Sequence, residues 1–226
     1  MVSPYSPPLP TATTGPYVIC IGREIASGGR QIGKLLSQRL GMTYYDSEIL
    51  SLAADHSGMS REVFLRSDEH RGLLHNMLTA LTPVPLGSNE IYGEQLSSDH
   101  LFALQSQAIR KAADEHSCIF IGRAADYVLR QHPRCISIFI SANTEDRLQR
   151  IMEKEGVNHR TALRMLNIGD RKRADFYNFY SQGTWGAADT YHLLINSSVM
   201  GISATADFIA DFARKTLHIG ELTQSN

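Results

Sequence analysis

The sequence contains few cysteines and no long apolar run. Its three cysteines, Cys20, Cys118 and Cys135, are widely spaced, and each lies inside a short apolar stretch. An odd number at this spacing argues against a disulfide framework or a zinc site, so we expect three reduced, buried side chains. No stretch approaches the roughly 20 apolar residues that are needed to cross a bilayer. We therefore expect a cytoplasmic protein with no membrane partner.

The chain also lacks a net charge of either sign. It has 22 lysines and arginines against 23 acidic residues, which gives a formal charge of −1. Such a chain has no overall field to attract DNA or RNA, so we expect small-molecule partners and no nucleic acid. Any anion site must be built from a local cluster of cations. The basic stretch from Arg147 to Arg173 keeps nucleic-acid binding as a weaker alternative, and the sequence does not indicate the oligomeric state.

The two ends differ from the rest of the chain. Residues 1–16 are rich in proline, serine and threonine and lack the basic start and apolar centre of a signal peptide, so we expect a flexible leader. Residues 218–226 are expected to form a C-terminal tail. The remaining residues, 17–217, are enough for one substantial domain that needs no disulfide or metal to fold.

Apolar β-prone runs alternate with helical patterns between the two ends. Strands are predicted at 17–21, 42–45, 117–121, 135–141 and 192–195. Helices are predicted at 32–40, 47–56, 101–116, 124–131, 144–155, 161–180 and 202–217. This alternation predicts an α/β fold, in which helices cover both faces of a parallel sheet. In such sheets the ligand binds at the carboxyl ends of the strands.

A glycine-bearing turn follows the first predicted strand, with the sequence Gly-Arg-Glu-Ile-Ala-Ser-Gly-Gly-Arg-Gln over residues 22–31. Backbone amides in such a turn, together with the N-terminus of the next helix, can cradle a phosphate. Arg30 stands where a P-loop carries its lysine, and Gln31 stands where a magnesium-binding hydroxyl is usual. Ser27 is then the available hydroxyl. The alternative is an ordinary turn with a solvated arginine.

Polar residues follow the other predicted strands as well. Asp46 could bind a substrate group or hydrated magnesium, or it could cap the next helix. Arg123, with Asp126 one helical turn further, could clamp a phosphate or make a surface salt bridge. Asn196 and Ser197 could contact a nucleobase or form an ordinary turn.

The strongest cationic features lie between the fourth strand and the fifth. They include Arg147, Arg150, Arg171 and Arg173. Phosphoryl transfer requires cations of this kind to neutralise charge that develops on the phosphate oxygens. The alternative is a pair of solvated basic helices.

Taken together, these segments resemble the cytidylate kinase-like family over roughly residues 18–209. The resemblance rests on short motifs in the right order, at 22–30, 44–46, 121–127, 145–148, 170–173, 177–180, 185–186 and 191–197. It implies a three-layer P-loop NTPase fold with a lid region at 143–173 and a helical insert at 59–100 that binds a nucleoside monophosphate. The insert itself has little of the family's expected pattern.

The resemblance also implies roles for individual residues. The ATP phosphates would contact Ser27, Gly28, Gly29, Arg30 and Gln31, and the adenine would lie near Asn196 and Ser197. The acceptor would contact Asp46, Arg123 and Asp126, and Mg²⁺ would be held at Ser27 and Asp46. Catalytic charge would come from Arg30, Arg147, Arg171 and Arg173.

The implied function is ATP-dependent phosphoryl transfer, with Mg²⁺, to a nucleoside monophosphate such as CMP or dCMP, or to a similar small acceptor. Three departures from cytidylate kinases bear on this reading: Arg30 replaces the lysine, Gln31-Ile32 replaces the hydroxyl-bearing pair, and Ala124 replaces an aspartate for which Asp126 is a stand-in. They leave open a non-catalytic nucleotide-binding regulatory module.

Overall fold

The computed structural model describes residues 6–46, 98–181 and 183–220. The chain divides into two compact units, residues 1–46 with 109–226, and residues 47–108. The helix predicted at 47–56 and nearly all of the predicted insert lie outside the described residues. Among the residues described, no helix combines the length and apolar character of a membrane span.

The larger unit is built on a five-stranded parallel sheet, as the sequence predicts. Its strands are β1 (Val18–Arg23), β2 (Thr43–Tyr45), β3 (Cys118–Ile121), β4 (Cys135–Ser141) and β5 (Leu193–Asn196), in the order β2-β3-β1-β4-β5. Every residue from Val18 to Ile21 is buried, as is every residue of β3. Such unbroken apolar runs are typical of a sheet that is covered on both faces. All three cysteines lie buried and unbridged in β1, β3 and β4, which confirms the prediction for them.

The strand register brings the candidate site residues to one edge. Val18 of β1 pairs with Cys118 of β3 and with Cys135 of β4, so these three strands start level. Ile21 is correspondingly level with Ile121 and Ile138. The segments that follow β1 and β3 therefore lie next to each other at the carboxyl edge of the sheet.

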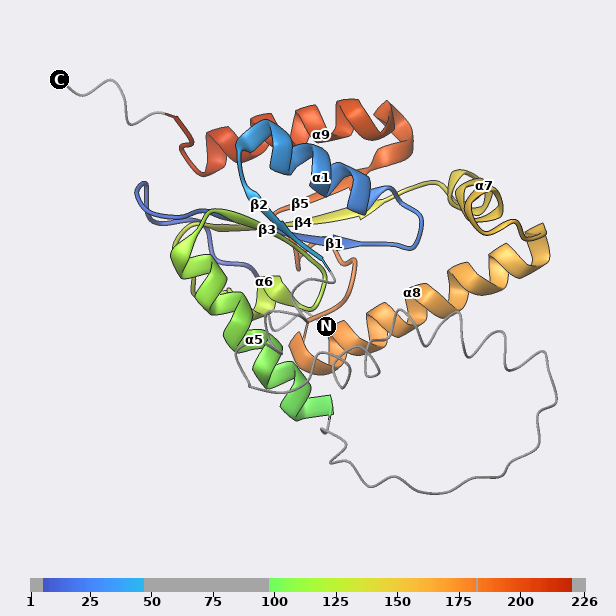
Figure 1. Ribbon diagram of the computed structural model, residues 1–226, viewed down its shortest axis with the longest axis horizontal. Helices are drawn as coiled ribbons and strands as arrows, with labels where there is room; N and C mark the ends of the chain where they lie inside the picture. Colours follow the sequence, from blue (N-terminus) through green and yellow to red (C-terminus); the bar gives the residue numbers. More distant parts are fainter. Residues whose placement is uncertain (1–5, 47–97, 182, 221–226) are drawn as a thin grey trace. The chain divides into compact units, whose positions relative to one another are not determined.

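Helices lie on both faces of the sheet. The described helices are α1 (Gly29–Leu40), α5 (Ser98–Glu115), α6 (Ala125–Val128), α7 (Thr144–Glu155), α8 (His159–Ser181) and α9 (Ser197–Thr216), of which α1, α6 and α9 pack on the strands. Helices α1 and α9 pack side by side on one face, and α6 lies on the other (Figure 1). The apolar core between α1, α9 and the sheet includes Ile21, Ile32, Leu36 and Ile209. Helices α7 and α8 contact each other.

Two predicted helix ends are confirmed. Gly41 and Gly156 close α1 and α7 in the left-handed conformation, with φ of 64° and 65°. Such positions favour glycine because it has no Cβ. Asn143 occupies the N-cap position of α7, but its side chain accepts a hydrogen bond from Asn196 instead of capping the helix.

Two helices differ from their predicted length. The helix predicted at 124–131 is only α6, four residues long, because Ala124 adopts φ of 50° and Leu129 leaves the helical conformation. The last helix starts at Ser197 and not at 202. Its first turn is separated from the rest by Gly201, whose φ of 78° and ψ of 169° are not helical.

Leu36 provides a test of the core between α1 and the sheet. Its side chain is fully buried, so we expect Leu36→Ala to lower the free energy of unfolding by about 2–5 kcal/mol. Urea denaturation followed by circular dichroism measures this. Gln38→Ala is the control, because Gln38 lies exposed on the same helix. Equal denaturation midpoints for both variants would contradict this packing.

Candidate functional site

The turn between β1 and α1 has the backbone of an anion cradle. We call residues 23–28 the phosphate loop. Ala26 and Gly28 both have positive φ, 57° and 83°, which turns the chain sharply into α1. A Cβ on Gly28 would lie 2.9 Å from Ile202 Cδ1, and one on Gly29 would lie 2.8 Å from Arg23 Cβ. The first amides of α1 have no partner within the helix and carry its positive end.

The carbonyl groups of this turn are all engaged by donors of the protein itself. Three arginines donate hydrogen bonds to these oxygens: Arg173 Nη1 to Arg23 O (3.0 Å), Arg147 Nε to Ile25 O (2.7 Å) and Arg150 Nη1 to Ala26 O (2.9 Å). Two serine hydroxyls donate to the other two: Ser197 Oγ to Ser27 O (2.6 Å) and Ser27 Oγ to Glu24 O (3.0 Å). The negative ends of these peptide dipoles therefore face protein donors. An anion at the loop meets less repulsion as a result.

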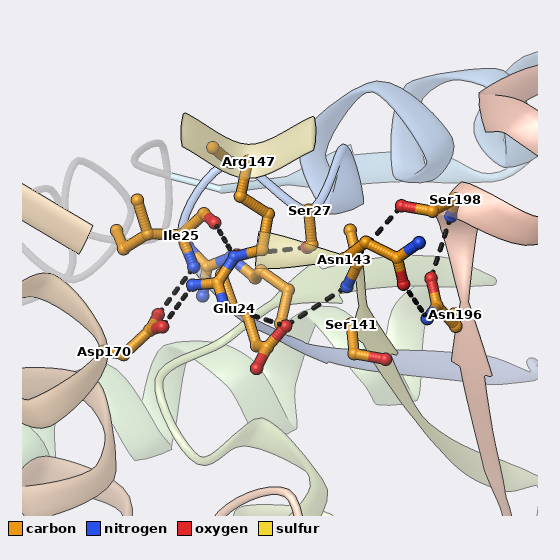
Figure 2. A network of polar contacts seen from close by, with 12 residues as sticks. Glu24, Ile25, Ser27, Ser141, Asn143, Arg147, Asp170, Asn196 and Ser198 are labelled. Atoms are coloured by element: carbon orange, nitrogen blue, oxygen red, sulfur yellow. Dashed lines mark hydrogen bonds and ion pairs between the residues drawn. The ribbon is translucent and has the colours of Figure 1, made fainter. Parts of the chain in front are cut away.

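Arg147 is the centre of the polar network in Figure 2. It is 4% exposed, and besides Ile25 O it contacts Glu24 (Nη1 to Oε2, 3.2 Å) and the Asp170 carboxylate. Asp170 in turn accepts a hydrogen bond from Ile25 N at 2.7 Å. Glu24 Oε2 also accepts one from Ala142 N at 3.1 Å. Burial raises the pKa of Glu24, and the Arg147 charge opposes that rise.

A second group of arginines gathers around Asp46. Asp46 Oδ2 lies 2.6 Å from Arg30 Nε, and Asp46 Oδ1 lies 3.8 Å from Arg23 Nη2. Burial lowers the pKa of Arg23 to about 10, Asp46 opposes this, and the neighbouring charges of Arg30 and Arg123 add to it. Burial, followed by the charge of Arg23, also lowers the pKa of Arg173. We call Arg23, Arg30, Arg123 and Arg173 the arginine cluster.

Arg23 is the member of this cluster that the sequence did not single out as a site residue. A Cβ on Gly122 would lie 2.1 Å from Arg23 Nη1, so the guanidinium packs directly against the turn that follows β3. Its Nε is buried without a hydrogen-bond partner. The sequence feature that could have identified Arg23 is its position as a charged residue at the carboxyl end of an otherwise apolar strand.

Residues 18–199 match the model of the cytidylate kinase-like family. The chain belongs to that family. This membership supports a nucleotide-binding kinase, a transferase of phosphoryl groups, as the sequence predicts, and the parallel sheet flanked by helices confirms the α/β fold.

Comparisons with other proteins add two structural likenesses. An uncharacterised protein from Eubacterium ventriosum ATCC 27560 is 26% identical with a TM-score of 0.64, over 87% of this chain and 98% of that one. Shikimate kinase from Acinetobacter baumannii is 13% identical with a TM-score of 0.49, over 90% of this chain and 95% of that one. A comparison with curated proteins gave no match.

In this cytidylate kinase-like chain, the residues predicted to contact phosphate or to supply catalytic charge differ in their exposure to solvent and in their partners. Gln31 and Arg30 lie exposed on the first turn of α1. Arg171 is also exposed, at 84% of its side chain, and faces Asp175 at 3.8 Å on the same helix. The structure thus brings Arg30 and Arg173 to Asp46 but leaves Arg171 outside the arginine cluster.

The side chains of Asn196 and Ser197, which were predicted to lie near the adenine, form hydrogen bonds with backbone groups of the protein. Asn196 Oδ1 accepts a hydrogen bond from Ser198 N at 2.9 Å and so caps α9. Ser197 is buried and donates to Ser27 O in the phosphate loop (the 2.6 Å bond described above). The last strand is thereby tied to the loop.

Ser27 and Asp46 do not fit the predicted magnesium site in this arrangement. The Ser27 hydroxyl is fully buried and donates to Glu24 O, and the Asp46 carboxylate pairs with Arg30. Within the described part of the chain, no three histidine, cysteine or acidic side chains gather as metal ligands. The donor set around the loop instead suits an anion.

Asp126 lies buried between α6 and α8. Its carboxylate accepts a hydrogen bond of 2.5 Å from the hydroxyl of Tyr177. Burial raises the pKa of Asp126 from 3.8 to about 6, and the Tyr177 hydrogen bond opposes the rise. Asp126, which was predicted to contact the acceptor, is therefore buried and hydrogen-bonded to Tyr177.

This buried carboxyl predicts a pH effect on stability. Between the unfolded pKa of 3.8 and the folded pKa of about 6, the native state binds the proton more tightly, so its stability falls as pH rises through this window. Relative to Asp126→Asn, the wild type should lose up to about 3 kcal/mol of unfolding free energy from pH 4 to 7. Urea denaturation at several pH values measures the difference.

Asp175→Asn is the matched control for that measurement, because Asp175 is exposed on α8. Its unfolding free energy should differ from that of the wild type by an amount that hardly changes with pH. A pH-independent difference between the wild type and Asp126→Asn would show that Asp126 does not titrate as described.

Proposed function

We propose that this chain transfers the γ-phosphoryl group of ATP to a nucleoside monophosphate such as CMP or dCMP. The observation that carries the proposal is the arginine cluster at the carboxyl edge of the sheet, beside a loop whose carbonyls are already engaged. Arg23, Arg30 and Arg173 bring three positive charges to the surroundings of Asp46 in a chain whose net charge is −1. Charge of this kind is what a donor and an acceptor phosphate together require.

The donor phosphates would lie on the phosphate loop. Amides of the first turn of α1 point along the helix axis, where an anion is favoured. Arg30 is exposed on that turn, so its guanidinium can leave Asp46 and pair with phosphate oxygens. We assign no residue of the described chain to Mg²⁺, which would enter as the counterion of ATP.

The acceptor phosphate would lie on the β3 side of the loop. Arg23 packs against the turn after β3, and Arg123 follows in that turn. Both belong to the carboxyl edge of the sheet, so an acceptor held there would face the donor on the loop. Catalysis would then rest on positioning and charge, because phosphoryl transfer needs little covalent chemistry from the protein.

A non-catalytic nucleotide-binding module is the second candidate. The observation that favours it is the Ser27 hydroxyl, which is buried and donates a hydrogen bond to Glu24 O. With the P-loop lysine replaced by Arg30, such a module would bind ATP but transfer no phosphoryl group.

Arg30→Ala tests the assignment. Because Arg30 is exposed, the variant should fold normally, and loss of one charged donor should lower kcat/KM by about 100-fold or more. The measurement is ADP release in a coupled assay with ATP and Mg²⁺ over a panel of nucleoside monophosphates. Lys215→Ala removes an exposed cation from the last turn of α9 and should leave the rate unchanged.

The outcomes separate the two candidates. Acceptor-dependent ADP release that disappears in Arg30→Ala supports the kinase and identifies its substrate. Saturable ATP binding without release for any acceptor would favour the module. Full turnover in Arg30→Ala would overturn the role of the phosphate loop.

A further inference from the structure

The segment expected to form the lid is attached to the phosphate loop. Arg147 and Arg150 of α7 and Arg173 of α8 each donate to a carbonyl of residues 23–26 (the hydrogen bonds described above). Their guanidinium groups are therefore used on the backbone of the loop. Only Arg173 among them also belongs to the arginine cluster.

The strongest attachment is made by an ion pair between α7 and α8. Arg147 binds the oxygen of Ile25, and Asp170 binds its amide, so both polar groups of this residue are held by one Arg–Asp pair (Figure 2). Arg147 is almost completely buried. Removing Arg147 would leave the carboxylates of Glu24 and Asp170 without this cation, and removing Asp170 would leave Arg147 paired with Glu24 alone.

Packing of the Ile25 side chain supports the same attachment. A Cβ on Gly169 would lie 2.6 Å from Ile25 Cγ1, so α8 approaches this side chain closely next to Asp170. Ile25 also packs against a small apolar cluster that includes Leu148 of α7 and Leu166 of α8. The middle of the phosphate loop is thus held by both helices through polar and apolar contacts.

We propose that Arg147 and Asp170 are positioning residues that set the shape of the phosphate loop for ATP. The proposal rests on the proposed function only for the identity of the ligand. Arg147 acts through Ile25 and does not touch the transferred phosphoryl group. Arg147 of α7 and Asp170 of α8 keep their contacts with the loop when nucleotide binds. A loop displaced by about 1 Å is expected to cost up to about 100-fold in function.

Calorimetric titration with ATP, without any acceptor, tests the proposal independently of catalysis. Arg147→Gln and Asp170→Asn should each raise the Kd for ATP by about 10- to 100-fold. The double variant should be little worse than the weaker-binding single variant, because the two residues act as one unit. Arg147→Lys should restore part of the affinity relative to Arg147→Gln, since it keeps the charge but lacks the planar fork of the guanidinium group.

The stoichiometry distinguishes positioning from a loss of folded protein. A merely structural defect lowers the fraction of binding-competent molecules and leaves the Kd of the remainder unchanged. Asp170→Asn leaves Arg147 with its Glu24 partner, so it tests the proposal if Arg147→Gln fails to fold. Lys154→Ala, an exposed cation on α7, is the control and should bind like the wild type.

Hydrogen exchange of the loop amides provides a readout that needs no nucleotide. The Ile25 amide is bonded to Asp170 and should exchange slowly in the wild type and faster in both single variants. Unchanged Kd values, additive losses in the double variant, or a loss confined to kcat would each overturn the proposal. If the wild type binds no ATP, the proposed function fails, and unchanged exchange in the variants would then overturn the positioning role.

Discussion

The site depends on how the backbone carbonyls of the phosphate loop are held. A loop that binds an anion must present its amides and turn its carbonyl oxygens elsewhere. In this chain each carbonyl from Arg23 to Ser27 has a defined donor, and three of these donors are arginines from α7 and α8. The fold brings these helices to the loop because β4 lies beside β1 and α7 follows directly from β4.

Two sets of arginines with different environments follow from this arrangement. Arg147 is buried against two carboxylates, Glu24 and Asp170, so its charge is compensated within the protein. Arg30 is half-exposed and forms its ion pair with the carboxylate of Asp46. The first kind of arginine stabilises the loop, and the second kind remains able to exchange a carboxylate for a phosphate.

Local patterns in the sequence were enough to predict most of the fold. Short β-prone runs, mostly apolar, identified all five strands, and the helices α1 and α7 end at Gly41 and Gly156 as their patterns indicate. Errors arose where a short segment took an unusual backbone conformation, as at Ala124 and Gly201, because neighbouring residues there resemble helix formers.

The site was predicted less completely. The position of the phosphate loop and the gathering of Arg30 with Asp46 follow because the carboxyl ends of parallel strands lie at one edge of the sheet, which the alternation of strands and helices does indicate. The partners of Arg147 and Asp126 do not, because they lie 122 and 51 residues away in the chain. Spacing can show that an arginine is present in a helix, but not whether it faces a ligand or a carbonyl.

A crystal structure with a non-hydrolysable ATP analogue would test the central claim most directly. The account predicts that the analogue's phosphates contact the first turn of α1 and Arg30, that Asp46 gives up its contact with Arg30, and that Arg147 stays on Ile25 and Asp170. Phosphates bound by Arg147, with its loop contacts broken, would contradict the account.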